Sequence, residues 1–413
     1  MITDILAEKI IHRDTYLDHI SRYYHTPIIK VLIGQRRVGK STILKSVIQQ
    51  LVGQKSIKTE NIFYINKELF ECDHIKQYDD LKSEFAIFMA TTTVGRIFVW
   101  IDEIQEIHGW EKFINGLLSQ YGENIEIFIT GSNSFLLSGE LATYITGRYI
   151  EFHIFPLSFL EFCIFKNAEK TKENFLEYLK YGWLPAIFRM EYSDQIIFPY
   201  LQSVYNTIIL KDIIQYHKIK NIQFFKDLYK YTMSNIGSII SGKSIKDYLK
   251  SQGISVWNET VLNFLHYAEN TFLLHKVYSV NPDTKKYFEI YNKYYAGDLG
   301  LRNSLVGYDL KRDIGKLLEN YVFLELQRYG YDVTIGRPSS GREIDFIAQR
   351  NGITKYFQVC YLLGSEDTIK REYTPLQEIG DNWEKYVVSW DDVDFGISEG
   401  IKHIHVMRLG EVL

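Results

Sequence analysis

The sequence predicts an α/β protein whose N-terminal part is a parallel sheet covered by helices on both faces. An apolar run at residues 28–33 leads directly into the glycine-containing segment 34–41. A second apolar run, at 97–101, ends in the adjacent carboxylates Asp102 and Glu103. Both runs belong to an alternation of strand-like and helical segments. That alternation favours a parallel sheet with its functional groups at the carboxyl ends of the strands.

The glycine-containing segment reads Gly-Gln-Arg-Arg-Val-Gly-Lys-Ser, which is the spacing of a phosphate-binding loop, hereafter the phosphate loop. Gly34 and Gly39 allow the backbone to curl so that successive N–H groups face a β-phosphate, and Lys40 reaches the β- and γ-oxygens. Ser41 can then bind Mg²⁺. Helical periodicity at 42–48 places a helix N-terminus, with its partial positive charge, under the anion.

The two carboxylates after the second apolar run fit further roles at a phosphate site. Asp102 fits the Mg²⁺ shell, and Glu103 fits the base that orients or deprotonates the attacking water. Taken alone, the pair could be a polar turn after a strand, but the preceding phosphate loop favours the functional interpretation. A strand-like run at 125–129 ends in small polar residues, so Ser132 or Asn133 would lie beside a γ-phosphate and sense it. The predicted nucleotide-binding residues are Gly34, Val38, Gly39, Lys40, Ser41, Thr42 and Ser132.

Length and composition restrict the remaining classes. A chain of 413 residues suggests two or three domains, and 46% hydrophobic residues suffice for several cores. The three cysteines are far apart and lack metal-ligand spacing, which predicts a reducing cytoplasm without disulfides. Because there is no signal pattern and no long apolar run, we expect neither secretion nor membrane spanning. With a formal net charge of −4, any nucleic-acid binding would need a local patch.

The chain is expected to divide into three parts. Strand-like runs at 61–65 and 149–154 complete the first domain, at residues 1–156. Residues 157–304 are predicted to form a helical linker and a winged-helix module, and residues 305–413 a third, α/β domain. The module is predicted from three helix candidates and a hairpin, at 224–236, 244–252, 258–270, 272–277 and 286–290.

The charge of the predicted winged-helix module leaves its partner open. Between residues 211 and 260 there are eight lysines and four acids, an excess that is compatible with contacts to DNA phosphates. No arginine-rich recognition helix stands out, because the third helix candidate carries Asn258, Glu259 and His266. Winged helices also dock proteins, so DNA and a protein partner both remain candidates.

The third domain carries the pattern of a degenerate nuclease. A helical acid, Glu319, an Ile-Asp pair ending in Asp345, and a strand with Gln358 and Cys360 resemble the core of the restriction-endonuclease-like PD-(D/E)XK fold. An active member would carry Glu-x-Lys in that strand. Gln358 is a weaker metal ligand, and Cys360 supplies no fixed positive charge. We therefore expect a docking scaffold without nuclease activity, although Glu319 and Asp345 could hold a hard cation.

Motifs along nearly the whole chain resemble a bacterial and archaeal family of AAA-type P-loop ATPases with a C-terminal domain of restriction-endonuclease-like fold. The motifs are the phosphate loop and residues 101–105, 130–134, 146–148, 155–159, 181–185 and 342–346. The resemblance implies ATP and Mg²⁺ as ligands, hydrolysis of ATP, and Arg148 as an arginine finger or phosphate sensor within its own subunit or on a neighbour. From composition alone, Arg148 would be a surface arginine that closes a turn. Arg13 and Tyr16 are implied to border the adenine.

These observations together predict a cytoplasmic ATPase that controls its winged-helix and nuclease-like domains according to the bound nucleotide. Two alternatives remain: a DNA-binding regulator, and a nucleotide-gated interaction scaffold with little turnover that engages another protein or a second copy of this chain. Steady turnover, salt-dependent DNA binding and a nucleotide-dependent change of partner distinguish the three hypotheses.

Overall fold

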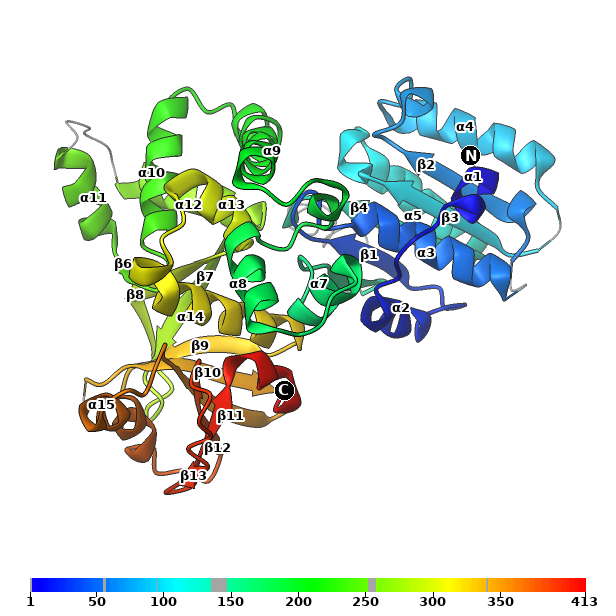
Figure 1. Cartoon of the computed structure of the whole chain (residues 1–413). Helices are drawn as coiled ribbons and strands as arrows, with labels where there is room; N and C mark the ends of the chain where they lie inside the picture. The colour runs from blue at the N-terminus through cyan, green and yellow to red at the C-terminus, as the bar shows by residue number, and fades with distance from the viewer. Residues whose placement is uncertain (1, 55–56, 94, 135–146, 252–257, 339–340) are drawn as a thin grey trace. The chain divides into compact units, whose positions relative to one another are not determined.

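The computed structural model describes residues 2–54, 57–93, 95–134, 147–251, 258–338 and 341–413 (Figure 1). The chain divides into two compact units. Unit 1 consists of Met1–Leu157 together with the short segments Leu184–Ala186 and Asn270–Phe272. Unit 2 consists of Ser158–Trp183, Ile187–Glu269 and Leu273–Leu413.

Unit 1 is built on a five-stranded parallel sheet with the strand order β2-β3-β4-β1-β5. Strands β1 to β4 are buried along their whole length, which explains why the sequence shows continuous apolar runs rather than alternation. The predicted parallel sheet is therefore confirmed. The elements up to residue 157 are α1 (Ile2–Ala7), α2 (Asp14–Ser21), β1 (Ile29–Ile33), α3 (Lys40–Gly53), η1 (Thr59–Asn61), β2 (Ile62–Asn66), η2 (Phe70–Cys72), α4 (Tyr78–Thr91), β3 (Ile97–Asp102), η3 (Ile104–Glu106), α5 (Trp110–Tyr121), η4 (Gly122–Asn124), β4 (Ile125–Gly131) and β5 (Tyr149–His153).

Helices cover both faces of this sheet. α4 and α5 contact each other and pack on the face to which Val31, Val99 and Ile127 point, where they form one apolar core (Figure 1). α3 contacts β3 and β4 and is accompanied by α1 and α2. Because side chains alternate along a strand, Trp100 points to the opposite face from Val99, and its ring stacks on Phe128 with centroids 5.2 Å apart.

Unit 2 contains a nine-stranded mixed sheet with the order β13-β14-β12-β11-β10-β9-β7-β8-β6. Its elements, with the 3-10 turn that begins in unit 1, are α7 (Phe159–Lys166), α8 (Lys172–Tyr181), η6 (Pro185–Arg189), α9 (Asp194–Thr207), η7 (Ile208–Gln215), α10 (Ile222–Ser234), β6 (Ile239–Ile240), α11 (Gly242–Ser251), α12 (Asn258–Asn270), β7 (Leu274–Val280), β8 (Tyr287–Ala296), α13 (Leu299–Val306), α14 (Leu310–Arg328), β9 (Asp332–Gly336), β10 (Ile344–Arg350), β11 (Ile353–Val359), α15 (Glu366–Gln377), β12 (Glu384–Ser389), β13 (Ile397–Ser398), β14 (Ile401–His405) and η8 (Val406–Glu411). Among the described residues, no helix combines the length and the apolar character needed to cross a bilayer.

The helices and hairpin predicted between residues 222 and 290 are present. Their chain order is α10, β6, α11, α12, β7 and β8, and β8 pairs antiparallel with both β6 and β7. The hairpin starts later than predicted, since Phe272 has a left-handed φ of 58° and β7 begins at Leu274. β7 also pairs with β9, so the strands of the predicted module and of the predicted third domain share one sheet. Their designations as winged-helix and nuclease-like remain predictions.

The motif at residues 181–185 forms a crowded turn. Gly182 has a φ of 74°, and a Cβ atom there would lie 2.4 Å from the backbone N of Gly300. Asp298 fixes the turn by accepting hydrogen bonds from the backbone N–H of Trp183 at 2.7 Å and of Leu301 at 2.8 Å. Burial raises the pKa of Asp298 to about 6, although these backbone N–H groups oppose the shift. The motif therefore has a structural reason for its glycine.

Candidate functional site

Three strand ends meet at one edge of the sheet in unit 1. β4 lies between β1 and β3, and all three run in the same direction. The phosphate loop follows β1, Asp102 is the last residue of β3, and Ser132 follows β4. Ile33 is paired with Gly131, so the loop and Ser132 start side by side. The carboxyl edge thus collects groups that are far apart in the sequence, as in other open α/β sheets that bind ligands.

The phosphate loop has the backbone conformation that its glycines permit. Gly34 has a φ of 150°, and a Cβ atom there would lie 2.2 Å from the carbonyl oxygen of Ile154. Gly39 has a φ of 98° and directly precedes α3, whose first residue is Lys40. Backbone N–H groups in the first turn of a helix lack intrahelical partners, so they are available to an anion. The loop and helix N-terminus predicted from the sequence are both present.

Lys40 is buried at the centre of the site. Its Nζ atom donates hydrogen bonds to the carbonyl oxygens of Gly34 at 2.9 Å and of Gln35 at 3.1 Å. The same atom lies 3.9 Å from Oε1 of Glu103. Carbonyl oxygens of the phosphate loop therefore hold the ammonium between the loop backbone, which would bind phosphate, and the carboxylate of Glu103.

Asp102 fits the role of a magnesium ligand. Its side chain is fully buried, and its Oδ2 atom has no hydrogen-bond partner among the residues that the structure describes. Burial and the neighbouring Glu103 raise the pKa of Asp102 to about 6, while hydrogen bonds from Thr130 and Ser41 and the charge of Lys40 oppose the shift. A carboxylate oxygen without a partner beside a serine hydroxyl suits a hard cation such as Mg²⁺. Ser41 and Asp102 are thus the residues that would hold the ion.

Glu103 is a buried but ionised carboxylate. Burial alone would raise the pKa of Glu103, but Lys40 and Arg36, with hydrogen bonds from Gln105 and Ser132, bring it below its ordinary value. Its backbone has a left-handed φ of 55°, and its N–H donates to Oγ1 of Thr130 at 3.0 Å. A carboxylate held in its charged form close to the phosphate loop can orient water or accept its proton.

The other predicted site residues of the loop and of β4 lie at the same edge. Ser132 and Asn133 are buried after β4, and Val38 is buried within the loop. Thr42 is exposed on the first turn of α3. Arg36 of the loop pairs with Glu68 at 3.4 Å.

Two residues near the loop, Arg13 and Gln35, have positions that were not predicted from the sequence. Arg13 is buried and donates from Nη1 to the carbonyl oxygens of Val38 at 3.1 Å and of Phe155 at 2.9 Å, so it ties the loop to the end of the domain. Gln35 is buried, and within the described part of the chain neither polar atom of its side chain has a hydrogen-bond partner. Its position inside the loop was the one available signal. Whether Arg13 and Tyr16 border the adenine remains a prediction.

The structure does not bring Arg148 to this edge. Arg148 is exposed and immediately precedes β5, where its carbonyl oxygen accepts a hydrogen bond from the N–H of Ile29 at 2.8 Å. β5 is parallel to β1, so Arg148 lies at the start of the strands whereas the phosphate loop lies at their ends. Five strand residues separate the two edges by roughly 16 Å, beyond the reach of an arginine side chain. The expected contact with phosphate in the same subunit is therefore corrected; only the alternative on a neighbouring subunit remains a prediction.

The raised pKa of Asp102 predicts a pH dependence of metal binding. A metal ligand must be deprotonated, so Mg²⁺ affinity should be full above about pH 6 and fall roughly tenfold for each unit below it. Mg²⁺-dependent binding of an ATP analogue, followed by calorimetry from pH 5 to 8, checks this. The nucleotide also takes up protons in this pH range. The variant Asp102→Asn has no carboxyl group at this position, so the pH dependence that it keeps should come from the nucleotide alone. Equal profiles for both proteins would contradict the assignment.

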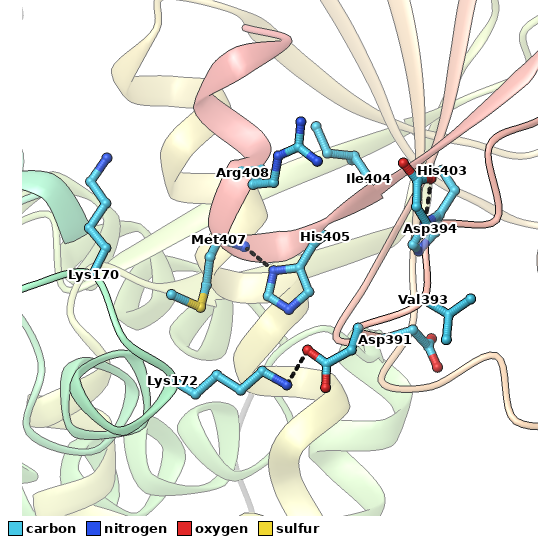
Figure 2. Close-up of a pocket in the computed structure, with 11 residues that line it drawn as sticks. Lys170, Lys172, Asp391, Val393, Asp394, His403, Ile404, His405, Met407 and Arg408 are labelled. Atoms are coloured by element: carbon cyan, nitrogen blue, oxygen red, sulfur yellow. Dashed lines mark hydrogen bonds and ion pairs between the residues drawn. The ribbon is translucent and has the colours of Figure 1, made fainter.

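A cavity of about 350 Å³ in unit 2 contains none of the predicted site residues (Figure 2). Lys172 pairs with Asp392 at 2.5 Å, and Nδ1 of His405 accepts a hydrogen bond from the N–H of Met407 at 3.2 Å. Asp391 accepts hydrogen bonds from Ser389 and from the N–H of Leu363, each at 2.8 Å. These contacts join residues of the protein to one another and indicate no particular ligand.

Two family models match separate segments of the chain. A family model described as AAA domain matches residues 26–163, and one described as domain of unknown function (DUF8612) matches residues 172–312. The chain is 34% identical to an uncharacterized protein of Haemophilus influenzae, over 97% of this chain and 99% of that one. It is 30% identical to an uncharacterized protein of Methanocaldococcus jannaschii, over 94% of this chain and 86% of the other.

Solved structures show weaker similarity. A Walker-type ATPase of Pyrococcus abyssi aligns with a TM-score of 0.47 and 14% identity, over 72% of this chain and 96% of that one. The Orc1 protein of Aeropyrum pernix, solved in complex with DNA, aligns with a TM-score of 0.31 and 12% identity, over 73% and 93% of the two chains. These values are too low to bear on function.

Proposed function

This chain belongs to one family with an uncharacterized protein of Haemophilus influenzae and one of Methanocaldococcus jannaschii, and its residues 26–163 match an AAA domain; we propose that it binds and hydrolyses Mg-ATP and thereby switches its second unit between two states. The observation that carries the proposal is the meeting of Lys40, Asp102 and Glu103 at one edge of the sheet. They supply a cation for phosphate oxygens, a metal ligand and an ionised base.

Each group has a separate task in this proposal. Lys40 and the backbone N–H groups of the phosphate loop bind the phosphate chain. Mg²⁺, when bound, neutralises charge on the phosphate oxygens. Glu103 orients the attacking water and accepts its proton, while Ser132 and Asn133 report whether a γ-phosphate is present. Arg148 contributes to hydrolysis only if it reaches the site of a neighbouring copy.

The second unit is proposed to be the part that the nucleotide controls. The chain order α10, β6, α11, α12, β7, β8 and the pairing of β8 with both neighbours support a winged-helix module. Glu319 on α14 and Asp345 on β10 support the likeness of the following part to an inactive nuclease fold. The partner of this unit is proposed to be DNA or a protein, in the cytoplasm. A DNA-binding regulator or a scaffold with little turnover is the alternative.

Two short segments provide a physical link between nucleotide state and the rest of the chain. Leu184–Ala186 and Asn270–Phe272 belong to unit 1, although the chain on both sides of each belongs to unit 2. Pro185 lies next to Gly39 of the phosphate loop, 3.7 Å from where a Cβ atom on Gly39 would be. Asn270 accepts a hydrogen bond from Ser134 at 2.9 Å, directly after the proposed sensors. A change in the loop or after β4 would therefore act on these segments.

Amide hydrogen exchange tests the proposed switch. With Mg-ATP bound to the slow variant Glu103→Gln, peptides that contain residues 184–186 and 270–272 should exchange at least about threefold more slowly than with Mg-ADP. Lys40→Ala is the control, because at a nucleotide concentration that saturates Glu103→Gln it should bind little nucleotide and show no difference. Identical exchange of these peptides in both nucleotides, at verified saturation, would contradict the switch while leaving ATP binding intact.

A further inference from the structure

Unit 2 contains a buried lysine surrounded by three carboxylates. Lys293 lies on β8, and only 5% of its side chain is exposed. Its Nζ atom is 2.8 Å from Oε1 of Glu319, 2.6 Å from Oε1 of Glu343 and 3.8 Å from Oδ1 of Asp345. The acids come from α14, from the residue before β10 and from β10 itself. We call these four residues the Lys293 cluster.

The cluster has more negative than positive charge. Burial would lower the pKa of Lys293, but Glu319, Asp345 and Glu343 raise it well above its usual range, so the ammonium stays charged. Burial and Glu319 raise the pKa of Asp345 well above its ordinary range against the opposing charge of Lys293. Three carboxyl groups face one ammonium, so the cluster has an excess of negative charge. A divalent ion would neutralise this charge more fully than the ammonium does.

The geometry is that of an ammonium site. Ligand oxygens lie about 2.0 to 2.6 Å from Mg²⁺ or Ca²⁺, whereas two of the three oxygens here are at hydrogen-bond distance from Nζ. Within the described ranges, no three histidine, cysteine or acidic residues are placed to hold a metal ion directly. Two of the acids also accept other hydrogen bonds. Glu319 accepts one from the Tyr295 hydroxyl at 2.6 Å, and Asp345 accepts one from the Val359 N–H at 2.8 Å.

We propose that the Lys293 ammonium takes the place of a divalent metal ion in this cluster, joining β8, α14 and β10 without metal, and that removal of the ammonium creates a divalent-cation site. The acids are held by several elements, so they would stay close to one another after the lysine is shortened or neutralised, and a bound ion would draw their oxygens inward from the positions that now suit the ammonium. Glu343 also lines a cavity of about 470 Å³, which provides a path for a hydrated ion. The proposal is independent of the proposed ATPase activity.

Manganese titration of the full-length protein without nucleotide tests the proposal. Loss of the free Mn²⁺ signal in electron paramagnetic resonance counts bound ions. Lys293→Met should bind one more Mn²⁺ per chain than the wild type, and Mn²⁺ should raise its midpoint of thermal unfolding. The double variant Lys293→Met with Glu319→Gln should lose the added ion. Lys286→Met, the same substitution at an exposed lysine, should bind as the wild type does.

Two results would overturn the proposal. The first is a folded Lys293→Met protein, judged by circular dichroism, that gains no Mn²⁺ site. The second is a wild-type protein that binds Mn²⁺ in a manner abolished by Glu319→Gln, because the ammonium would then not replace the metal. The second measurement needs no substitution of Lys293, so it decides the matter even if Lys293→Met does not fold.

Discussion

Replacing Lys40 by Ala is expected to weaken binding of Mg-ATP at least about 100-fold. Hydrogen bonds to charged groups contribute about 1.5 to 3 kcal/mol each, and the ammonium is expected to reach both the β- and the γ-phosphate. Its own partners are the carbonyl oxygens of Gly34 and Gln35, which fix it over the loop. Titration calorimetry with a slowly hydrolysed ATP analogue measures the loss directly.

Lys45→Ala is the matched control for this substitution. Lys45 lies on the same helix and pairs with Glu8 at 2.7 Å, at a partly exposed position. A surface ion pair contributes at most about 1 kcal/mol to stability, so this variant should fold and bind ATP as the wild type does. Wild-type affinity in a folded Lys40→Ala protein would refute the assignment of the phosphate loop.

Replacing Glu103 by Gln is expected to lower kcat about 10²- to 10⁴-fold while ATP still binds. Glutamine keeps the size of the side chain but has no charge with which to accept a proton. The lowered pKa of Glu103 implies that the wild-type group is ionised at neutral pH, so activity should not require high pH. Release of phosphate, measured at saturating Mg-ATP, gives kcat, and calorimetry gives the affinity.

Glu106→Gln provides the control for the loss of charge. Glu106 is exposed and lies in η3, which begins directly after Glu103. Its substitution should leave both kcat and affinity within about twofold of the wild type, since surface changes of this kind have small effects. Unchanged turnover in Glu103→Gln would instead mean that another group activates water. A wild type without measurable turnover would favour the scaffold alternative.

Local sequence predicted most of the elements of unit 1 and the chemistry of its site. The apolar runs predicted as strands are β1 and β3, and both are buried at every position. The functional groups lie at the carboxyl ends of these strands. The glycines at 34 and 39 have the conformations that the loop needs. Such features depend on neighbours in the chain, so they can be predicted from spacing and composition.

Other assignments could not be made from neighbouring residues. The register of β5 against β1 placed Arg148 at the edge opposite the phosphate loop. Arg13 binds carbonyl oxygens of residues 38 and 155, and nothing near Arg13 in the sequence indicates either. Lys293 was not singled out, because its three acids come from residues 319, 343 and 345.

The sequence by itself determined that this chain has a phosphate loop, two adjacent acids at the end of a strand, and an α/β fold that can position them. Only the tertiary structure decided that β4 lies between β1 and β3 and that Arg148 lies at the edge opposite the phosphate loop. It also decided that Lys293 is the cation that faces the acids of unit 2. The physical reason is that strand order and register are set by packing between segments distant in the chain. A shift of either moves a side chain to another edge or face without changing any local pattern.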